Sequence, residues 1–281
     1  MHPEAKRIWV VADDYGIARG VNAAIRDLLT QGAINATSVM VVASGFDERE
    51  AAALAALRAA SGIGVGLHLT LTAPFRPLVA DYAPTRAGSF LPLGETFVAA
   101  ALGRMRAEVL EAETAAQIAR FVEVFGWAPD YIDGHQHVHL FPRVANAALA
   151  AARKGAPRAW IRQCGRAVRS APEAKALVLD LLSARFRKRA AAAGLRTNPG
   201  FAGSYDFGTR TDFAELFATF LQGLPDGGLI MCHPGLVDAE LARNDTLTSP
   251  REREYAFFQS SAYRELLAVN NCTLAQRSRS A

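Results

Sequence analysis

The stretch Ile8-Trp9-Val10-Val11-Ala12-Asp13-Asp14 contains the pattern that decides the fold. Five consecutive apolar residues, rich in β-formers, predict a short buried strand, and two carboxylates follow at its C-terminal end. The same pattern recurs at His68 within 63–69, at Asp133 and His135 after 131–132, and at His233 after 228–232. Because the C-terminal ends of parallel strands share one face of a barrel or sheet, we expect these residues to lie on one rim.

Helical periodicity separates the apolar runs. Strands are predicted over 8–12, 37–42, 63–69, 131–133, 159–162, 228–232 and 272–274. Helices are predicted over 17–29, 47–60, 104–125, 142–154, 172–193, 212–224 and 250–269. This alternation is typical of parallel strands covered by helices. The predicted fold is therefore α/β, an irregular (β/α) barrel, with an open doubly wound sheet as the alternative.

The chain has no internal repeat, low-complexity tract or linker-like change of composition, which predicts one domain over residues 1–281. Residues 72–94 contain four prolines and little periodicity. Loops of that length inside a domain are usually functional, so we interpret this one as a lid or substrate loop. Residues 277–281 are expected to form a disordered tail.

Composition excludes several classes of protein. A hydrophobic content of 51% and a charged content of 21% are those of a globular chain in water. No uninterrupted apolar run reaches about 18 residues, so no membrane span and no membrane partner are expected. The three cysteines are odd in number and far apart, which favours a reducing compartment and predicts a cytoplasmic protein.

Positive charge is concentrated in residues 143–196, which hold 13 Lys and Arg against two Asp and Glu. Such a basic segment either forms a solvated helical surface or attracts phosphates, nucleic acid or acidic glycans. It lacks the interleaved aromatic residues of a base-stacking platform, so we expect no nucleic-acid partner.

The richest cluster of candidate ligands is Asp133-Gly134-His135-Gln136-His137-Val138-His139. Alternate residues of an extended chain point to the same side, so His135, His137 and His139 are expected to share one face. Neutral imidazole is the commonest metal ligand, and such a cluster either coordinates an ion or orients one ligand with the others behind it.

Carboxylates beside histidines suit a catalytic divalent metal, which typically has three protein ligands and a water molecule. A nearby carboxylate can then take the proton of that water. Asp13 and Asp14 cannot both point the same way from a regular strand, so we expect one to be a ligand and the other a base. The alternatives are structural: a helix cap or turn for the Asp pair, a core residue for His68 and a strand end for His233.

Two further residues are candidates for substrate contact. Arg162 ends a predicted strand, where it could hold an anion or a carbonyl group, although a surface position is the simple alternative. Tyr15 could stack on a sugar ring, although plain packing is the commoner role of such a residue.

Four motifs resemble those of the YdjC/ChbG-like carbohydrate deacetylases. They occur in the family order, span residues 12–234, and read Ala12-Asp13-Asp14-Tyr15-Gly16, Gly66-Leu67-His68-Leu69-Thr70-Leu71-Thr72, Asp133 to His139 with Pro142, and Met231-Cys232-His233-Pro234. The resemblance implies an irregular (β/α) barrel of the polysaccharide-deacetylase type. It also implies removal of an N-acetyl group from an amino sugar such as a chitooligosaccharide.

Carried over by motif, the resemblance assigns the metal to Asp14, His68 and His135. It makes Asp13 the general base and His233 the acid that protonates the leaving amine. One divalent ion is implied, Zn²⁺ or Mg²⁺, and the substrate partner is an N-acetylated sugar. The remaining candidates are expected to lie behind the metal ligands or near the substrate: Asp133, His137, His139, Arg162 and Tyr15.

Other functions remain open on the sequence alone. A metal-dependent sugar isomerase or phosphoesterase uses a similar barrel, although no lysine stands at a predicted strand end. A non-catalytic binder of glycans or nucleic acid would use residues 143–196 instead. The apolar C-terminal helix would allow a homodimer, and the sequence does not decide the oligomeric state.

Overall fold

The computed structural model describes residues 4–167, 174–207 and 212–277, and its strands form one parallel sheet. The strands are β1 (Lys6–Tyr15), β2 (Ala36–Val39), β3 (Gly64–Leu69), β4 (Tyr131–Gly134), β5 (Trp160–Ile161), β6 (Phe201–Ala202), β7 (Gly228–Cys232) and β8 (Cys272–Leu274). The helices are α1 (Arg19–Thr30), α2 (Glu48–Ser61), α3 (Leu93–Ala101), α4 (Ala107–Phe125), the 3₁₀ helix η1 (His135–Leu140), α5 (Val144–Gly155), α6 (Ala174–Ala192), α7 (Phe213–Leu221), α8 (Ala239–Asn244), α9 (Ser249–Gln259) and α10 (Ser261–Val269).

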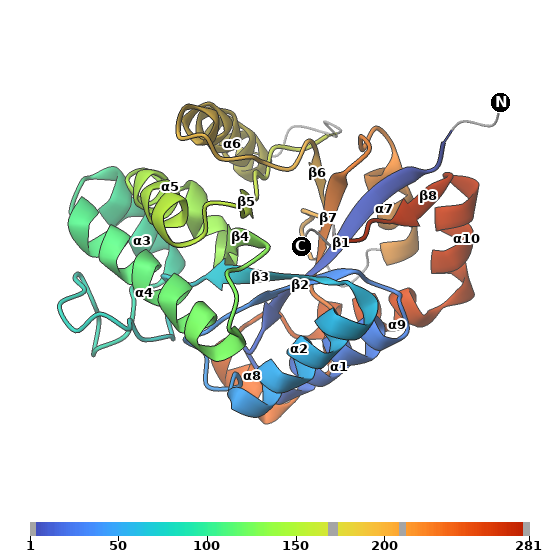
Figure 1. The fold of residues 1–281 in the computed structure, drawn as a ribbon, viewed down its shortest axis with the longest axis horizontal. Helices are drawn as coiled ribbons and strands as arrows, with labels where there is room; N and C mark the ends of the chain where they lie inside the picture. Colours follow the sequence, from blue (N-terminus) through green and yellow to red (C-terminus); the bar gives the residue numbers. More distant parts are fainter. Residues whose placement is uncertain (1–3, 168–173, 208–211, 278–281) are drawn as a thin grey trace.

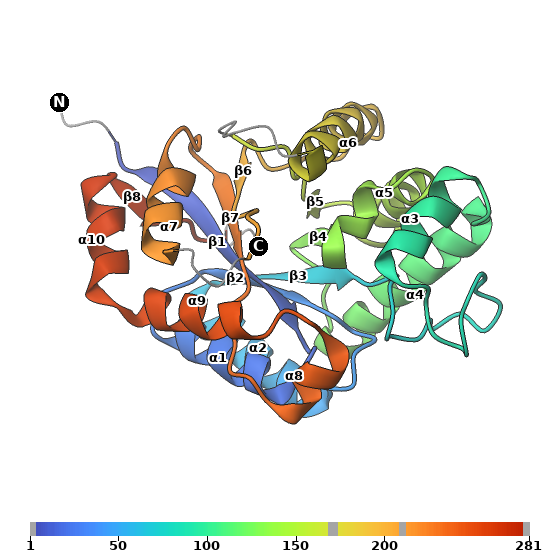
Figure 2. The same ribbon diagram turned by 180° about the vertical axis from the view of Figure 1, so that it is seen from behind.

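The sheet curls into a barrel. Its strand order is β5-β4-β3-β2-β1-β7-β6, and β8 pairs with the N-terminal part of β1. The two outer strands approach each other through single parallel bridges, between Ile161 and Thr197 and between Arg166 and Phe201. Helices surround the curled sheet on its outer side (Figures 1 and 2). The predicted irregular (β/α) barrel is therefore confirmed.

The strands form because their side chains are buried on both sides. In β1 every residue from Val10 to Tyr15 is buried, and Leu67, Ile132 and Ile230 in other strands of the sheet are also inaccessible to water. Removal of this apolar surface from water is the main stabilising contribution to folding. It leaves the C-terminal strand ends as the place where polar side chains cluster.

Some elements differ from the sequence prediction. The helix predicted over 250–269 is two helices, because the backbone turns at Ser260, whose side chain caps α10 by accepting from the amide of Tyr263. Helix α3 begins inside the predicted loop 72–94, and β6 lies between the helices predicted over 172–193 and 212–224, where no strand was predicted. The predicted tail starts at Arg277, whose amide donates to Gly62, and residues 278–281 lie outside the described residues.

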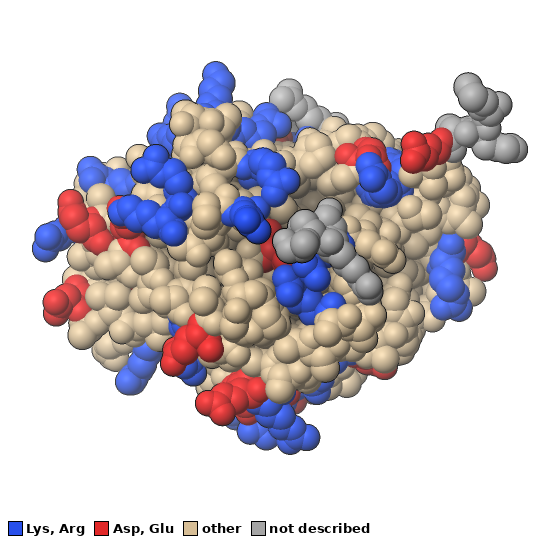
Figure 3. All heavy atoms as spheres, viewed as in Figure 1, with Lys and Arg blue, Asp and Glu red and all other residues tan. Residues whose placement is uncertain are grey.

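The basic segment 143–196 lies mainly on α5 and α6, where Figure 3 shows Lys and Arg side chains on one face of the molecule. Several of its charges are neutralised: Lys154 pairs with Glu111 at 2.6 Å, and Arg166 pairs with Asp180 at 2.9 Å. Within the described residues, no helix is both long and apolar enough to cross a membrane.

Candidate metal centre

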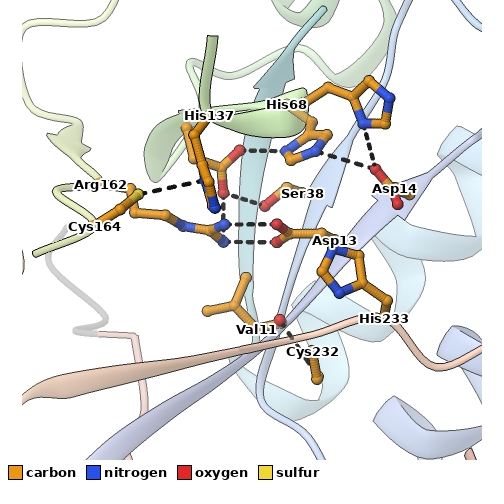
Figure 4. Close-up of polar contacts among 12 residues, drawn as sticks. Val11, Asp13, Asp14, Ser38, His68, His137, Arg162, Cys164, Cys232 and His233 are labelled. Atoms are coloured by element: carbon orange, nitrogen blue, oxygen red, sulfur yellow. Dashed lines mark hydrogen bonds and ion pairs between the residues drawn. The ribbon is translucent and has the colours of Figure 1, made fainter. Parts of the chain in front are cut away.

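Three of the predicted ligands meet at the C-terminal ends of β1, β3 and β4. The Oδ1 atom of Asp14 lies 2.8 Å from Nδ1 of His135 and 3.1 Å from Nε2 of His68 (Figure 4). All three side chains are buried, and their ligand atoms lie within 4.8 Å of one another. The strand-end pattern of the sequence therefore brings these residues together, although they are up to 121 positions apart.

A β-bulge allows adjacent carboxylates to serve the same rim. Ala12 pairs with Thr37 and Tyr15 with Val39, so two residues of β1 stand opposite one residue of β2. Asp14 adopts a left-handed backbone conformation with φ of 68°, which Asp tolerates better than most residues. In a regular strand the side chains of Asp13 and Asp14 would point to opposite faces. The bulge interrupts this alternation, so both carboxylates can lie at the same rim.

Asp133 holds His68 from behind. Its Oδ1 atom lies 2.6 Å from Nδ1 of His68, and its Oδ2 atom accepts from Ser38 at 2.5 Å. Because an ionised carboxylate only accepts, the Nδ1 proton of His68 points to Asp133, and Nε2 is left to face Asp14. A carboxylate behind a ligating histidine fixes the ring and raises its basicity.

Arg162 links two carboxylates of the site. Its guanidinium donates to both oxygens of Asp13, at 2.6 and 2.7 Å, and lies 2.5 Å from Oδ2 of Asp133. All three side chains are buried. Burial alone would raise the pKa of Asp133, but the nearby Arg162 and His68 lower it to about 2. Arg162 thus belongs to the centre of the site and does not lie on the surface.

The electrostatics of the centre suit a cation. Burial would lower the pKa of His68, yet Asp133 and Asp13 raise it to about 10, so the carboxylates hold a positive charge at this point. One carboxylate and two imidazoles are also a donor set that Zn²⁺ and similar ions accept. Two groups of described residues could hold a metal ion: Asp14, His68 and His135, and a second set in which Asp13 and Asp133 join His68. Both carboxylates of the second set are already paired with Arg162, so the first set is the better candidate.

Helix α9 supplies a residue that the sequence analysis missed. Arg251 is fully buried, and its Nη2 atom lies 2.6 Å from both Oδ2 of Asp14 and Oδ2 of Asp245. The pKa of Asp14 is well below its usual range, because Arg251 and His135 outweigh the effect of burial. A signal was present in the sequence: Arg251 shares a helix face with Phe257 and Phe258, and a charge on an apolar face is rarely left unpaired.

His233 follows β7 and is half-buried. Burial lowers its pKa below the ordinary value, although Asp14 and Asp13 oppose this. Its backbone amide donates to Glu254 at 2.5 Å, and the ring of Phe207 meets its imidazole edge-on at 5.3 Å. Figure 4 shows His233 beside Asp13.

The histidine tract does not have the extended conformation expected from its spacing. Strand β4 ends at Gly134, and η1 contains two left-handed residues, Gln136 and His137, with φ of 54° and 60°. As a result His139 turns away from the metal ligands, and its Nε2 atom lies 2.8 Å from the carbonyl oxygen of Arg162. His137 lies with Nδ1 3.5 Å from the sulfur of Cys164. The prediction that His135, His137 and His139 share one face is wrong.

Tyr15 has no open face for a sugar ring. It is fully buried, and its hydroxyl group bonds with Glu50 and with Arg26 on the helix side of the sheet. Its placement matches the alternative of plain packing.

The part of the predicted loop that precedes α3, residues 72–92, packs beside His135. The ring of Phe75 meets the His135 imidazole edge-on at 5.9 Å. The loop is tied to α4 by Glu113, whose carboxylate accepts from the amides of Leu78 and Val79 at distances of 2.9 to 3.2 Å. Its role as a lid stays a prediction.

Solved structures with the same fold include carbohydrate-active proteins. A protein described as a cellobiose-phosphate cleavage protein from Enterococcus faecalis V583 is 24% identical, with a TM-score of 0.74 over 98% of both chains. A peptidoglycan N-acetylglucosamine deacetylase is 10% identical, with a TM-score of 0.51 over 98% of this chain and 87% of that one. These likenesses define the class of fold as an irregular (β/α) barrel, which the chain shares with this deacetylase.

The sequence comparisons go further. The profile of the YdjC-like protein family matches residues 7–269. The chain therefore belongs to the YdjC-like family, which confirms the resemblance seen in its motifs. A chitooligosaccharide deacetylase from Escherichia fergusonii is 29% identical over 269 residues, which cover 94% of this chain and 95% of that protein.

Proposed function

We propose that this protein is a metal-dependent hydrolase that removes an N-acetyl group from an amino sugar or a chitooligosaccharide-like glycan. The observation that carries the proposal is the buried convergence of Asp14, His68 and His135 beside Asp13 and His233. The family membership and the chitooligosaccharide deacetylase relative support the choice of substrate class.

Asp14, His68 and His135 would hold one divalent ion, and the ligand set favours Zn²⁺ or a similar transition metal over Mg²⁺. When bound, such an ion lowers the pKa of water and polarises a carbonyl oxygen. Asp133 holds Nδ1 of His68 and would leave Nε2 available to the ion, and Arg251 holds the second oxygen of Asp14.

Asp13 and His233 would move the protons. Asp13, held by Arg162, accepts a proton from the attacking water as the new C–O bond forms at the acetyl carbon. His233 donates a proton to the amide nitrogen as the C–N bond breaks. The products are acetate and a free amino sugar.

The test is acetate release from N-acetylglucosamine oligomers by the purified protein, with its metal removed and then restored one ion at a time. Acetate release that depends on the metal supports the proposal. Metal binding without acetate release would keep the site and exclude this substrate class. Absence of metal binding under all conditions would refute the proposal.

A further inference from the structure

Glu254 is a buried carboxylate that the proposed reaction does not use. It is inaccessible to water, and its two oxygens accept from different segments: Oε2 from the backbone amide of His233 at 2.5 Å, and Oε1 from the hydroxyl group of Tyr205 at 2.6 Å. These partners are 21 and 49 positions away in the sequence. One side chain of α9 therefore joins the segment after β7 to the segment after β6.

Burial of the charged form of this carboxylate is unfavourable. Burial raises the pKa of Glu254 to about 7, even though Tyr205 and His233 both donate to it. An apolar side chain would avoid this cost, but it would leave the His233 amide and the Tyr205 hydroxyl group without an acceptor. The presence of a carboxylate here points to a task that needs two acceptors at fixed positions.

The imidazole of His233 needs such support. Its Nδ1 atom is buried and has no hydrogen-bond partner among the described residues. The ring is therefore oriented by its backbone and by Phe207, which meets it edge-on. Phe207 is in turn in contact with Tyr205, with ring centroids 4.2 Å apart. Glu254 holds both supports, through the His233 amide and through the Tyr205 hydroxyl group.

We infer that Glu254 is a positioning residue for His233, which it holds at a fixed place relative to Asp14. Arg251, one turn earlier on α9, contacts Asp14, so a single helix holds the metal side and the proton-donating side of the site. The inference rests on the proposed function, in which His233 protonates the leaving amine.

The decisive variant is Glu254→Leu, because it removes both acceptors and keeps the volume. Glu254→Gln keeps an oxygen for the His233 amide, Tyr205→Phe removes one donor, and Glu265→Leu is a control at an exposed position of α10. Each metal-loaded protein is assayed on an N-acetylglucosamine oligomer and on 4-nitrophenyl acetate, whose leaving group needs no proton. Misplacement of His233 is expected to lower amide hydrolysis by Glu254→Leu about 10²-fold and ester hydrolysis less than about threefold. Glu254→Gln is expected to recover most of the amide activity.

Equal loss on amide and ester would show a merely structural role and overturn the inference, and so would full amide activity in Glu254→Leu. A second readout does not depend on activity: the imidazole ¹⁵N signals of the metal-loaded protein, with that of His233 identified by its loss in His233→Gln. Glu254→Leu should shift the His233 signals and leave those of His68 and His135 in place. If the unaltered protein cleaves neither substrate, the proposed function fails, and an unmoved His233 signal would then separately refute the positioning role.

Discussion

Arg162 and Asp13 form a bidentate ion pair at the centre of the site. The two terminal nitrogens of the guanidinium group lie 2.6 and 2.7 Å from the two carboxylate oxygens. The same guanidinium also contacts Asp133, which holds His68. A single arginine thus connects the proposed base to the support of a metal ligand. The orientation of the base and the orientation of the ligand are consequently not independent.

Replacement of Arg162 should destabilise the protein strongly. Arg162→Met leaves two buried carboxylates, Asp13 and Asp133, without their shared partner, and such a loss costs about 3–5 kcal/mol of unfolding free energy. Urea denaturation at neutral pH measures the change. Arg158→Met, at an exposed position, should stay within about 0.5 kcal/mol of the unaltered protein. A similarly small effect for both variants would contradict the burial of the ion pair.

Metal binding should depend on the three converging side chains. His68→Ala and His135→Ala each remove one ligand atom from the buried group, so purified variants should contain much less than one metal ion per chain. Metal content by mass spectrometry of the purified proteins checks this. His137→Ala serves as the control, since its ring lies against Cys164 and Phe201, and it should retain the ion. Retention of metal by His135→Ala would exclude the proposed ligand set.

The proposed base should be separable from the metal. Asp13→Asn keeps the size of the side chain and leaves Asp14, His68 and His135 unchanged, so the metal content should be unaltered. Loss of the base is expected to slow acetate release by about 10²–10⁴-fold. Single-turnover assays on an N-acetylglucosamine oligomer give the rate. Full activity in Asp13→Asn would remove Asp13 from its role.

The stability of the protein should depend on pH through Glu254. Its pKa rises from 4.5 to about 7 on folding, so the folded state retains a proton that the unfolded state has lost. The resulting stabilisation is complete below about pH 4.5 and disappears as the pH rises through 7. Relative to Glu254→Gln, the unaltered protein should lose on the order of 3 kcal/mol of unfolding free energy between pH 4.5 and pH 8. Parallel pH curves for the two proteins would contradict the raised pKa.

The sequence predicts those parts of the site that depend on strand ends. His68 and Asp133 lie near the C-terminal ends of short strands, His233 follows another, and parallel strands bring their ends together whatever lies between them. The conformation of 135–140 could not be predicted, because the spacing of its histidines suits a strand and only the left-handed residues Gln136 and His137 reveal the turn.

Contacts with side chains of helices that are distant in the sequence also could not be predicted from the local sequence pattern. Arg251 and Glu254 lie in a run of four charged residues, Arg251 to Glu254, which resembles a solvated helix surface. Their roles depend on partners up to 237 positions away, Asp14 for Arg251 and His233 for Glu254. Periodicity indicates which face of α9 is buried, but the partner of each charge is fixed only by the tertiary fold.

The bulge at Asp14 restricts how the site can evolve. Metal sites often exchange one ligand type for another, but the left-handed backbone at this position favours Asp or Asn and penalises bulkier or branched residues by about 1–3 kcal/mol. A change from Asp14 to Glu or Cys therefore carries a backbone cost in addition to any change in coordination. The metal preference of the proposed site should therefore drift through His68 and His135, whose own backbones carry no such restriction, while the carboxylate stays fixed.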